Sequence, residues 1–147
     1  FPAMGLVILD KIIKILKNNQ GGLLLIDYGY IKNNYKNTIQ SLYRHKTNKV
    51  FDNLGMADIT SLVNFTLLKD YLLKKKLKTN RIVSQSFFLQ RMGIIERANI
   101  LAKKQKFSEQ SDLYYRLKRI LDKKYMGKLF KVLFAYSSKK KITIGFK

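Results

Sequence analysis

The chain has 147 residues, enough for one domain with its own core, and 46% of them are hydrophobic, too many for a disordered chain. It contains no cysteine and one histidine, which excludes a disulfide framework, a thiolate nucleophile and an ordinary zinc site. The formal net charge is +21, and 24 of the 30 basic residues are lysine.

This charge raises the question of a nucleic-acid partner, because basic side chains neutralise phosphates and release counterions. Arginine, which suits two-point contacts with phosphate or guanine, is the scarce basic residue, with six copies. We therefore expect solvated lysines on outer helix faces and no specific nucleic-acid partner. No apolar run approaches the roughly 18 residues that a membrane span needs, so we expect no membrane-spanning segment.

The first element in chain order is an amphipathic helix over residues 6–16, whose apolar side chains recur at the helical spacing. The glycine pair Gly21 and Gly22 ends it. Residues 23–26 are continuously apolar, which predicts a short strand covered by helices on both faces. Together these elements indicate an α/β unit.

The middle of the chain is more polar. We predict mostly loop over residues 30–55, with a short helix at 38–43. Asp58 or Thr60 is a plausible N-cap for a helix that continues through Leu77. The lysines that end this segment suit the negative end of a helix dipole and need no ligand to explain them.

The last third alternates between helix and strand patterns. Residues 81–84 predict a short strand, and residues 87–105 predict one or two helices broken at Gly93. A further helix is expected over 111–125, capped by Ser108.

Two β-rich runs, residues 129–136 and 142–147, are joined by a five-residue linker of serine and lysine. This spacing predicts an antiparallel hairpin at the end of the chain.

Four stretches, in this order, resemble the C-terminal part of the MidA-like S-adenosylmethionine-dependent methyltransferases. They are IDYGY at 26–30, GMADITSLVNF at 55–65, QSFFLQRMGI at 85–94 and MGKLFKVL at 126–133. That family includes a mitochondrial complex I assembly factor that methylates an arginine side chain. Where the family usually has Val-Asp-Phe, this sequence has Asn64 in the middle, which puts any role that needs a carboxylate there in doubt.

The resemblance implies an α/β fold: the C-terminal half of a class I, Rossmann-like methyltransferase sheet, with a helical insertion at about 36–125 and the terminal antiparallel hairpin. Residues 1–147 would form a single partial domain, with 23–26 as the fifth of seven strands. The implied cofactor is S-adenosylmethionine, but no G-x-G-x-G turn is present and most of its pocket would be missing. We therefore expect no methyl transfer by this chain alone.

The resemblance also suggests candidate site residues at the ends of the predicted elements. They are Asp27 and Asp58 as catalytic carboxylates, and Tyr28, Gly29, His45 and Thr60 as substrate contacts. Each has a structural alternative. Asp27 equally suits a capped turn, Asp58 a helix N-cap, and His45 an exposed position in a basic loop.

The implied partners are a protein substrate, with a respiratory complex I subunit as the candidate, and either the missing N-terminal half or a second copy of the chain. The missing half and the second copy are expected because the strand at 23–26 would otherwise expose a sheet edge. The implied location is the cytoplasm of a bacterium or the mitochondrial matrix. The alternative function is a basic remnant or binding module without catalysis.

Overall fold

The computed structural model describes residues 2–31 and 37–147. The helices and strands, in chain order, are α1 (Ala3–Asn19), β1 (Gly22–Tyr30), β2 (Gln40–Tyr43), β3 (Lys46–Asn48), β4 (Asp58–Thr60), β5 (Val63–Asn64), α2 (Phe65–Lys74), β6 (Lys78–Thr79), β7 (Val83–Ser84), α3 (Gln85–Arg91), α4 (Ile94–Ala102), α5 (Phe107–Leu121), α6 (Met126–Leu129) and β8 (Phe130–Tyr136).

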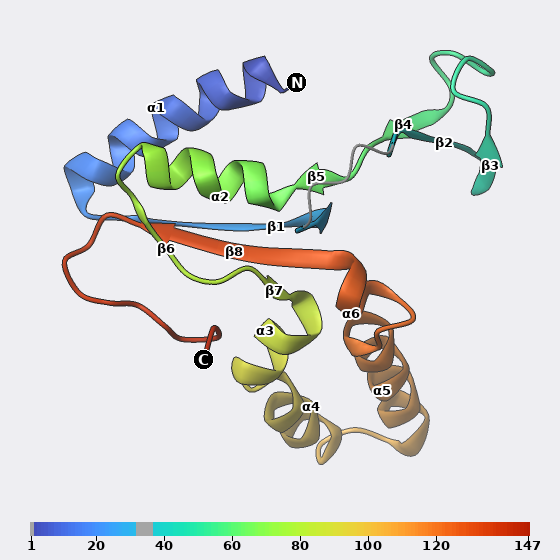
Figure 1. The fold of residues 1–147 in the computed structure, drawn as a ribbon. Coiled ribbons are helices and arrows are strands. Elements are labelled where there is room, and N and C mark those ends of the chain that lie inside the picture. Colours follow the sequence, from blue (N-terminus) through green and yellow to red (C-terminus); the bar gives the residue numbers. More distant parts are fainter. Residues whose placement is uncertain (1, 32–36) are drawn as a thin grey trace.

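The main sheet has the strand order β5-β1-β8-β6, and β7 also pairs with β8. β1 runs parallel to β5 and antiparallel to β8, while β6 and β7 both run antiparallel to β8. Helices α1 and α2 cover one face of this sheet, and α3 to α6 lie on the other side, towards the start of β8 (Figure 1). This mixed α/β arrangement is a partial Rossmann-like fold, as the sequence predicts.

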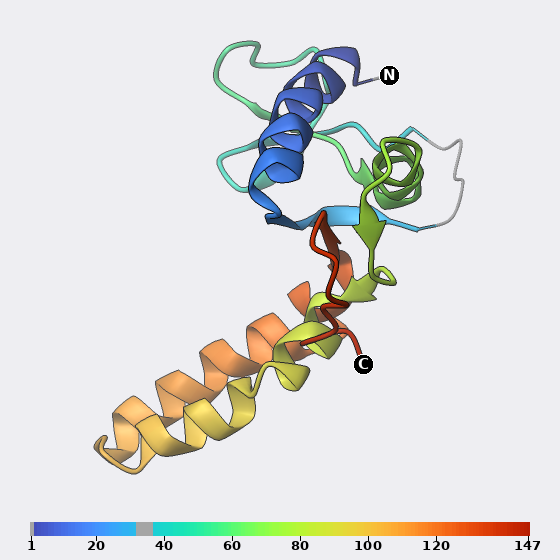
Figure 2. The ribbon, with the colours of Figure 1, turned by 90° about the vertical axis from the view of Figure 1, so that its left-hand side faces the viewer.

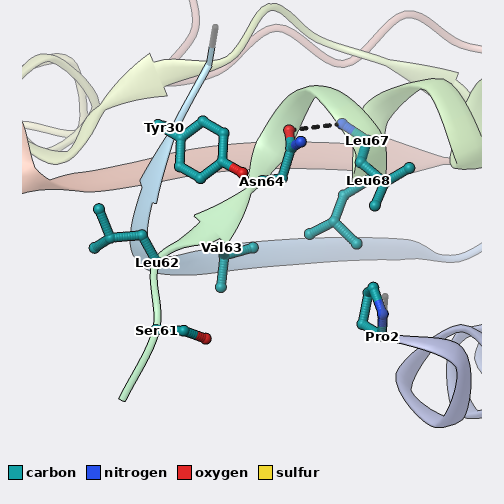
Figure 3. Close-up of a pocket in the computed structure, with 8 residues that line it drawn as sticks. All are labelled: Pro2, Tyr30, Ser61, Leu62, Val63, Asn64, Leu67 and Leu68. Atoms are coloured by element: carbon teal, nitrogen blue, oxygen red, sulfur yellow. Dashed lines mark hydrogen bonds between the residues drawn. The ribbon is translucent and has the colours of Figure 1, made fainter. Parts of the chain in front are cut away.

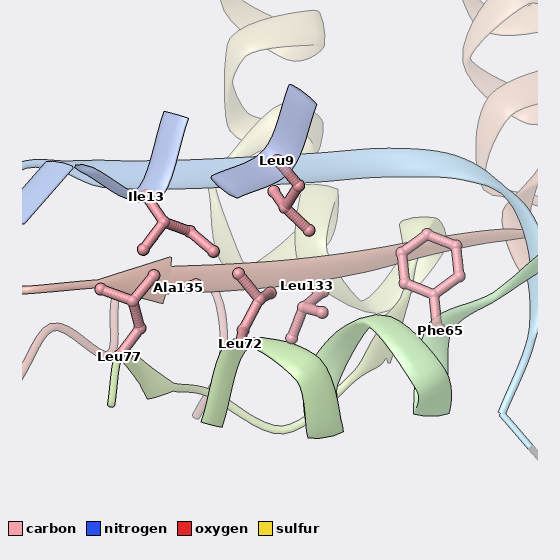
Figure 4. Close-up of a cluster of buried hydrophobic side chains, with 7 residues drawn as sticks. All are labelled: Leu9, Ile13, Phe65, Leu72, Leu77, Leu133 and Ala135. Atoms are coloured by element: carbon pink, nitrogen blue, oxygen red, sulfur yellow. The ribbon is translucent and has the colours of Figure 1, made fainter. Parts of the chain in front are cut away.

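The main hydrophobic core lies between the sheet and the helix pair α1 and α2. The expected amphipathic helix is confirmed, and it is longer than predicted at both ends. Gln20 adopts a left-handed conformation directly after Asn19 and ends α1 in place of the glycine pair. Figure 4 shows side chains from α1, α2 and β8 meeting in this layer. Its fully or almost fully buried members are Leu9, Ile13, Phe65, Leu72, Leu77, Leu133 and Ala135.

The predicted terminal hairpin is wrong. Residues 129–136 do contain a strand, β8, but residues 142–147 form no strand. Both edges of β8 are already occupied, by β1 on one side and by β6 and β7 on the other. The C-terminal tail instead packs through Phe146 against Phe88 and is held by hydrogen bonds from Asn80 to the carbonyl of Ile142 and from Arg81 to that of Phe146.

The predicted loop over 30–55 contains a small antiparallel sheet with the order β3-β2-β4. The helix expected at 38–43 is therefore wrong, since those residues lead into and form β2; residues 32–36 of the predicted loop lie outside the described residues. β2 and β3 are joined by Arg44 and His45, which both have positive φ, of 49° and 62°. Two such residues form the tight turn of a two-residue hairpin.

The second predicted helix begins later than expected. Asp58 and Thr60 belong to β4 and cap no helix, so that interpretation is wrong. Asn64 caps α2 by accepting a hydrogen bond from the backbone N–H of Leu67 at 3.0 Å. Among the lysines at the far end, Lys75 has a structural partner: its Nζ lies 2.8 Å from a carboxylate oxygen of Asp10.

The helices after β7 form an arm that projects away from the sheet (Figure 2). The predicted break at Gly93 is confirmed, because this residue has a φ of 81° and separates α3 from α4. α5 begins at Phe107, one residue before the predicted Ser108 cap, and the backbone N–H of Lys106 donates to the Glu109 carboxylate there. The single partial domain over 1–147 with an insertion at 36–125 remains an expectation; those bounds enclose a small sheet as well as helices.

β1 itself differs from the predicted strand that helices cover on both faces. Leu23 and Leu25 pack against the main core, whereas Leu24 and Ile26 on the opposite face are 43% and 44% exposed. Alternation along the strand thus separates a covered face from an uncovered one.

Candidate functional site at the end of β1

Two cavities lie near the carboxyl end of β1, on either side of the short segment that joins β4 to β5. Open α/β sheets bind ligands at this end of their strands. The larger cavity, of about 570 Å³, is lined by Pro2, Tyr30, Ser61, Leu62, Val63, Asn64, Leu67 and Leu68. Figure 3 shows Tyr30 and Asn64 on one side of this space and Pro2, directly before α1, on the other.

The second cavity, of about 300 Å³, lies between the small sheet and the main one. Its lining comes from β1, β2 and the residues before it, β4, the β4–β5 segment and α6: Tyr28, Thr38, Gln40, Leu42, Thr60, Ser61, Leu62 and Leu129. Leucine side chains provide an apolar wall, while hydroxyl groups and one amide provide hydrogen-bonding groups. Of the six predicted site residues, this cavity brings together two, Tyr28 and Thr60.

The segment between the cavities is fixed from both ends. The backbone N–H of Leu62 donates to the hydroxyl of Thr38 at 3.2 Å, which ties the segment to the residues that precede β2. Beyond it, Asn64 caps α2, and the hydroxyl of Thr66 donates to the carbonyl of Ile31 just after β1. Ser61 and Leu62 line both cavities but were absent from the predicted site. They belong to the family-like stretch at 55–65, which could have indicated them, but the two strands on either side are too short to recognise from the sequence.

Tyr28 is positioned by the next strand of the sheet. It pairs with Phe130 across the β1–β8 ladder, and the two ring centroids are 4.0 Å apart. Because Tyr28 remains 44% exposed, its ring both packs on β8 and borders the cavity. Tyr28 therefore both packs on its neighbour and lines the cavity, while its predicted contact with a substrate stays a prediction.

Asp27 is exposed and accepts a hydrogen bond from the backbone N–H of Tyr28 at 2.7 Å. The capped turn that was its structural alternative is wrong, because residues 27–29 all belong to β1. Lys131 is its partner across the ladder, yet the Lys131 ammonium donates to the carbonyls of Lys128 and Leu129. Burial and then the neighbouring Lys128 charge lower the pKa of Lys131 below its ordinary value. Sequence reasoning missed this cation because it is one lysine among many.

Gly29 is buried and has a packing role. A Cβ at this position would lie 2.5 Å from both the Phe65 ring and the carbonyl oxygen of Val63. The predicted substrate contact is therefore enclosed by β5 and the start of α2.

The other two predicted residues belong to the small sheet. Asp58 is exposed on β4, and His45 is exposed in the β2–β3 turn. Neither lines the two cavities described above.

The residues of this site do not fit the cofactor that the sequence resemblance implies. Cradling such a ligand needs a glycine-rich turn whose backbone is open to the ligand after a parallel strand. Here the ring of Phe65 occupies the space beside Gly29, near the end of β1, so the backbone there is not open to a ligand. Neither cavity has an acidic residue in its lining that would hold ribose hydroxyls. The cavities suit an amphipathic side chain better than a nucleoside.

Within residues 2–31 and 37–147, no helix combines the length and apolar character that crossing a bilayer requires.

Comparisons with known proteins match this chain to methyltransferases. A family model described as a putative S-adenosyl-L-methionine-dependent methyltransferase matches residues 2–83. Two curated relatives are both called "Protein arginine methyltransferase NDUFAF7, mitochondrial". The Danio rerio protein is 26% identical over 124 residues, and the Xenopus tropicalis protein is 28% identical over 126 residues. The matches cover 84% and 85% of this chain but 29% of each relative, so the chain spans less than a third of their length.

Two crystal structures of Burkholderia thailandensis proteins share the fold. One is an uncharacterized protein, with a TM-score of 0.75 and 21% identity over 91% of this chain and 39% of that protein. The other is described as a likely methyl transferase bound to S-adenosyl-homocysteine, with a TM-score of 0.72 and 20% identity over 93% of this chain and 38% of that protein.

These findings confirm the predicted resemblance to MidA-like enzymes and the cofactor of that family. Because the family model matches more than half of its residues, this chain belongs to the putative S-adenosyl-L-methionine-dependent methyltransferases.

Proposed function

We propose that this chain is the C-terminal portion of an S-adenosylmethionine-dependent protein arginine methyltransferase and forms a wall of the acceptor site. The observation that carries the proposal is the amphipathic cavity at the carboxyl end of β1, in a chain of this family. Two relatives named as protein arginine methyltransferases support the acceptor class. The cofactor would supply the methyl group from a part of the enzyme that this chain does not contain.

An arginine side chain matches the chemistry of the smaller cavity. Its guanidinium only donates hydrogen bonds, and the oxygens of Gln40, Thr60 and Ser61 can accept them. Its aliphatic stem suits the apolar wall made by Leu42 and Leu129. Methyl transfer depends largely on positioning the acceptor, so a rigid wall of this kind contributes directly to the reaction.

The predicted site residues have unequal parts in this proposal. Tyr28 and Thr60 contact the acceptor, while Asp27 and Asp58 are the carboxylates that offer charge to a guanidinium from outside the cavity. Gly29 acts through packing, and His45 through the turn that holds β2 and β3. A respiratory complex I subunit, which the family resemblance suggests, is the first protein acceptor to test, and the mitochondrial matrix is the proposed location in that case.

The test is a chimera in which this chain replaces the matched region of the Xenopus tropicalis relative. We expect the chimera to transfer a labelled methyl group from S-adenosylmethionine to arginine in a mitochondrial protein extract. We expect the isolated chain to transfer none and to bind the cofactor no more tightly than millimolar by calorimetry, since the cradle is missing. Micromolar binding by the isolated chain would overturn the second expectation.

Two threonine variants of the chimera locate the acceptor site. Thr60→Val removes a hydroxyl from the cavity and should lower methyl transfer by about tenfold, the effect of one lost hydrogen bond. Thr47→Val makes the same change on β3, outside both cavities, and should leave the rate unchanged. Equal rates for the two variants would remove the cavity from the mechanism.

The net charge of +21 favours one alternative, a binding module without catalysis that attracts acidic partners. An inactive chimera that nevertheless folds would favour this alternative.

A further inference from the structure

A small pocket lies where α5 meets the turn that leads into α6. Its volume is about 160 Å³, and its lining consists of two tyrosines and two cations: Tyr115, Lys118, Arg119 and Tyr125. The three residues from α5 are spaced at i, i+3 and i+4, which places them on one face of the helix. None of the four lines either cavity of the proposed acceptor site.

The backbone around this pocket is held by Asp122. Its carbonyl accepts hydrogen bonds from the backbone N–H groups of Tyr125 at 3.0 Å and Gly127 at 3.1 Å, and its carboxylate accepts one from that of Lys124 at 2.8 Å. α6 also packs directly on the end of α5, because a Cβ on Gly127 would overlap the Leu121 carbonyl. The backbone that carries the pocket is therefore fixed before any ligand binds, which limits the entropy lost on binding.

The side chains of the pocket are open to solvent. Tyr115 is 72% exposed and Tyr125 is 57% exposed. Within residues 2–31 and 37–147, no carboxylate lies within ion-pair distance of Lys118 or Arg119. Tyrosine and arginine are the residue types that contribute most to protein interfaces. A solvated helix face would account for the two cations but does not call for two tyrosine rings beside them.

The four side chains direct hydrogen-bond donors to one small space. Lys118 and Arg119 are positively charged and only donate, and the tyrosine hydroxyls can donate as well. Residues 115–128 hold six basic residues and one acidic residue, Asp122, whose carboxylate already accepts the bond from Lys124. These charges and donors select an anion, and arginine can bind a carboxylate at two points.

α6 places this pocket beside the acceptor cavity. Tyr125 directly precedes α6, and Leu129, the last residue of α6, lines that cavity. The four residues of α6 advance by about 6 Å, at about 1.5 Å each. An extended peptide advances by about 3.3 Å per residue, so a single acceptor chain can occupy both places.

We propose that this pocket is a second contact for the protein acceptor and binds an acidic side chain, glutamate or aspartate, about two to four residues from the arginine that is methylated. The cavity at the end of β1 holds the arginine itself, and the pocket favours acceptors that carry an acidic neighbour. This proposal rests on the proposed function.

Two observations choose an acidic side chain over a nucleotide or a nucleic acid. The pocket volume of about 160 Å³ is below the roughly 300–1,000 Å³ of small-molecule sites, and it suits one short side chain. Proteins that bind single-stranded nucleic acid use a charged groove with successive aromatic platforms. Here Tyr115 and Tyr125 border one pocket, which offers a place for one group.

Binding of two labelled peptides to the isolated chain tests the proposal. Both peptides have a central arginine; one has a glutamate about three positions to either side, and the other has glutamines there. Salt at about 0.15 M screens long-range attraction by the net charge. Fluorescence anisotropy should then give a Kd about tenfold lower for the glutamate peptide, the effect of a hydrogen bond between charged groups. Kd values that agree within about twofold would overturn the proposal.

A matched pair of double variants locates the binding site. Lys118→Gln with Arg119→Gln removes both cations of the pocket at exposed positions and should abolish the preference for glutamate. Lys103→Gln with Lys104→Gln removes the same charge from the link between α4 and α5, at the far end of the arm (Figure 2), and should preserve it. Circular dichroism confirms that each variant folds. Equal losses in the two double variants would assign the preference to net charge and overturn the pocket.

A single-stranded RNA tests the other class of partner. Tighter binding of this RNA than of the glutamate peptide, weakened by the pocket variant and not by the control, would overturn the proposal in favour of a nucleic acid. The chimera described above separates this proposal from the proposed function. A glutamate preference in binding together with an inactive chimera contradicts only the function, and an active chimera that methylates both peptides with equal kcat/KM contradicts only the acidic contact.

Discussion

The substitution Gly29→Ala distinguishes a packing glycine from one that contacts substrate. The added Cβ would lie 2.5 Å from the Cδ2 atom of Phe65 and 2.5 Å from the carbonyl oxygen of Val63. Phe65 is completely buried, so its ring has no open space to move into. Val63 is the ladder partner of Gly29, so its carbonyl moves only if β5 separates from β1.

The magnitude follows from these two contacts. Forcing one methyl group into a packed core costs about 1–3 kcal/mol when the neighbours yield. If β5 separates and Phe65 leaves the core instead, the cost rises to about 3–5 kcal/mol. We therefore expect a loss of about 3 kcal/mol, which lowers the Tm of a chain of this size by roughly 6–12 °C.

Urea unfolding followed by circular dichroism measures this loss. Gly5→Ala is the matched control, because its Cβ would lie on α1 with its nearest neighbour at 3.9 Å and should raise stability by about 0.5–1 kcal/mol. In a Phe65→Leu background, Gly29→Ala should cost less but still more than zero, since the Val63 carbonyl remains. A Gly29→Ala variant within about 0.5 kcal/mol of the wild type would refute the packing argument and restore the substrate contact.

Three further outcomes are expected from the same measurement. Asn64→Ala should cost about 1 kcal/mol through the lost cap of α2, whereas Asn64→Asp should keep the stability, because a carboxylate also accepts there; equal losses would contradict the cap. Hydrogen bonds between Asp10 and Lys75 lower the pKa of the carboxyl and raise that of the ammonium. Stability from Asp10 is thus present above its ordinary 3.8 and lost as pH falls through the lowered value, while stability from Lys75 is present below 10.5 and lost as pH rises through the raised value. Asp10→Asn should remove both of these changes of stability with pH, and an unchanged dependence of the unfolding free energy on pH would contradict the ion pair. Asp58→Ala should be neutral within about 0.5 kcal/mol, since Asp58 is exposed on β4, and a loss above 1 kcal/mol would restore its role as a cap.

Local signals decided which elements were predictable. The helical spacing of apolar residues predicted α1, and the positive φ that glycine tolerates predicted the break at Gly93. The β2–β3 hairpin was missed because its turn consists of Arg44 and His45, both with positive φ, where Asn-Gly is the usual signal. Pairing of β2 on both edges compensates for that unfavourable turn, and such pairing is not visible in the local sequence.

The terminal hairpin failed for a related reason. Residues 142–147 carry a strand-like composition, but a strand also needs a free edge, and β8 has none. Its edges are taken by segments far away in the sequence, residues 22–28 and 78–84, which the hairpin prediction did not consider.

The candidate site combines both kinds of information. Tyr28 was predictable because it leaves an apolar strand at the end where ligands bind, and it lines the cavity. The opposite wall depends on the hydrogen bond from Leu62 to Thr38, which joins residues 24 positions apart and brings the small sheet against the large one. Thr60 therefore reaches the cavity through β4 and not through the helix that it was expected to cap. A residue type at a strand end can indicate a site, but the shape of this cavity is set by contacts between the two sheets.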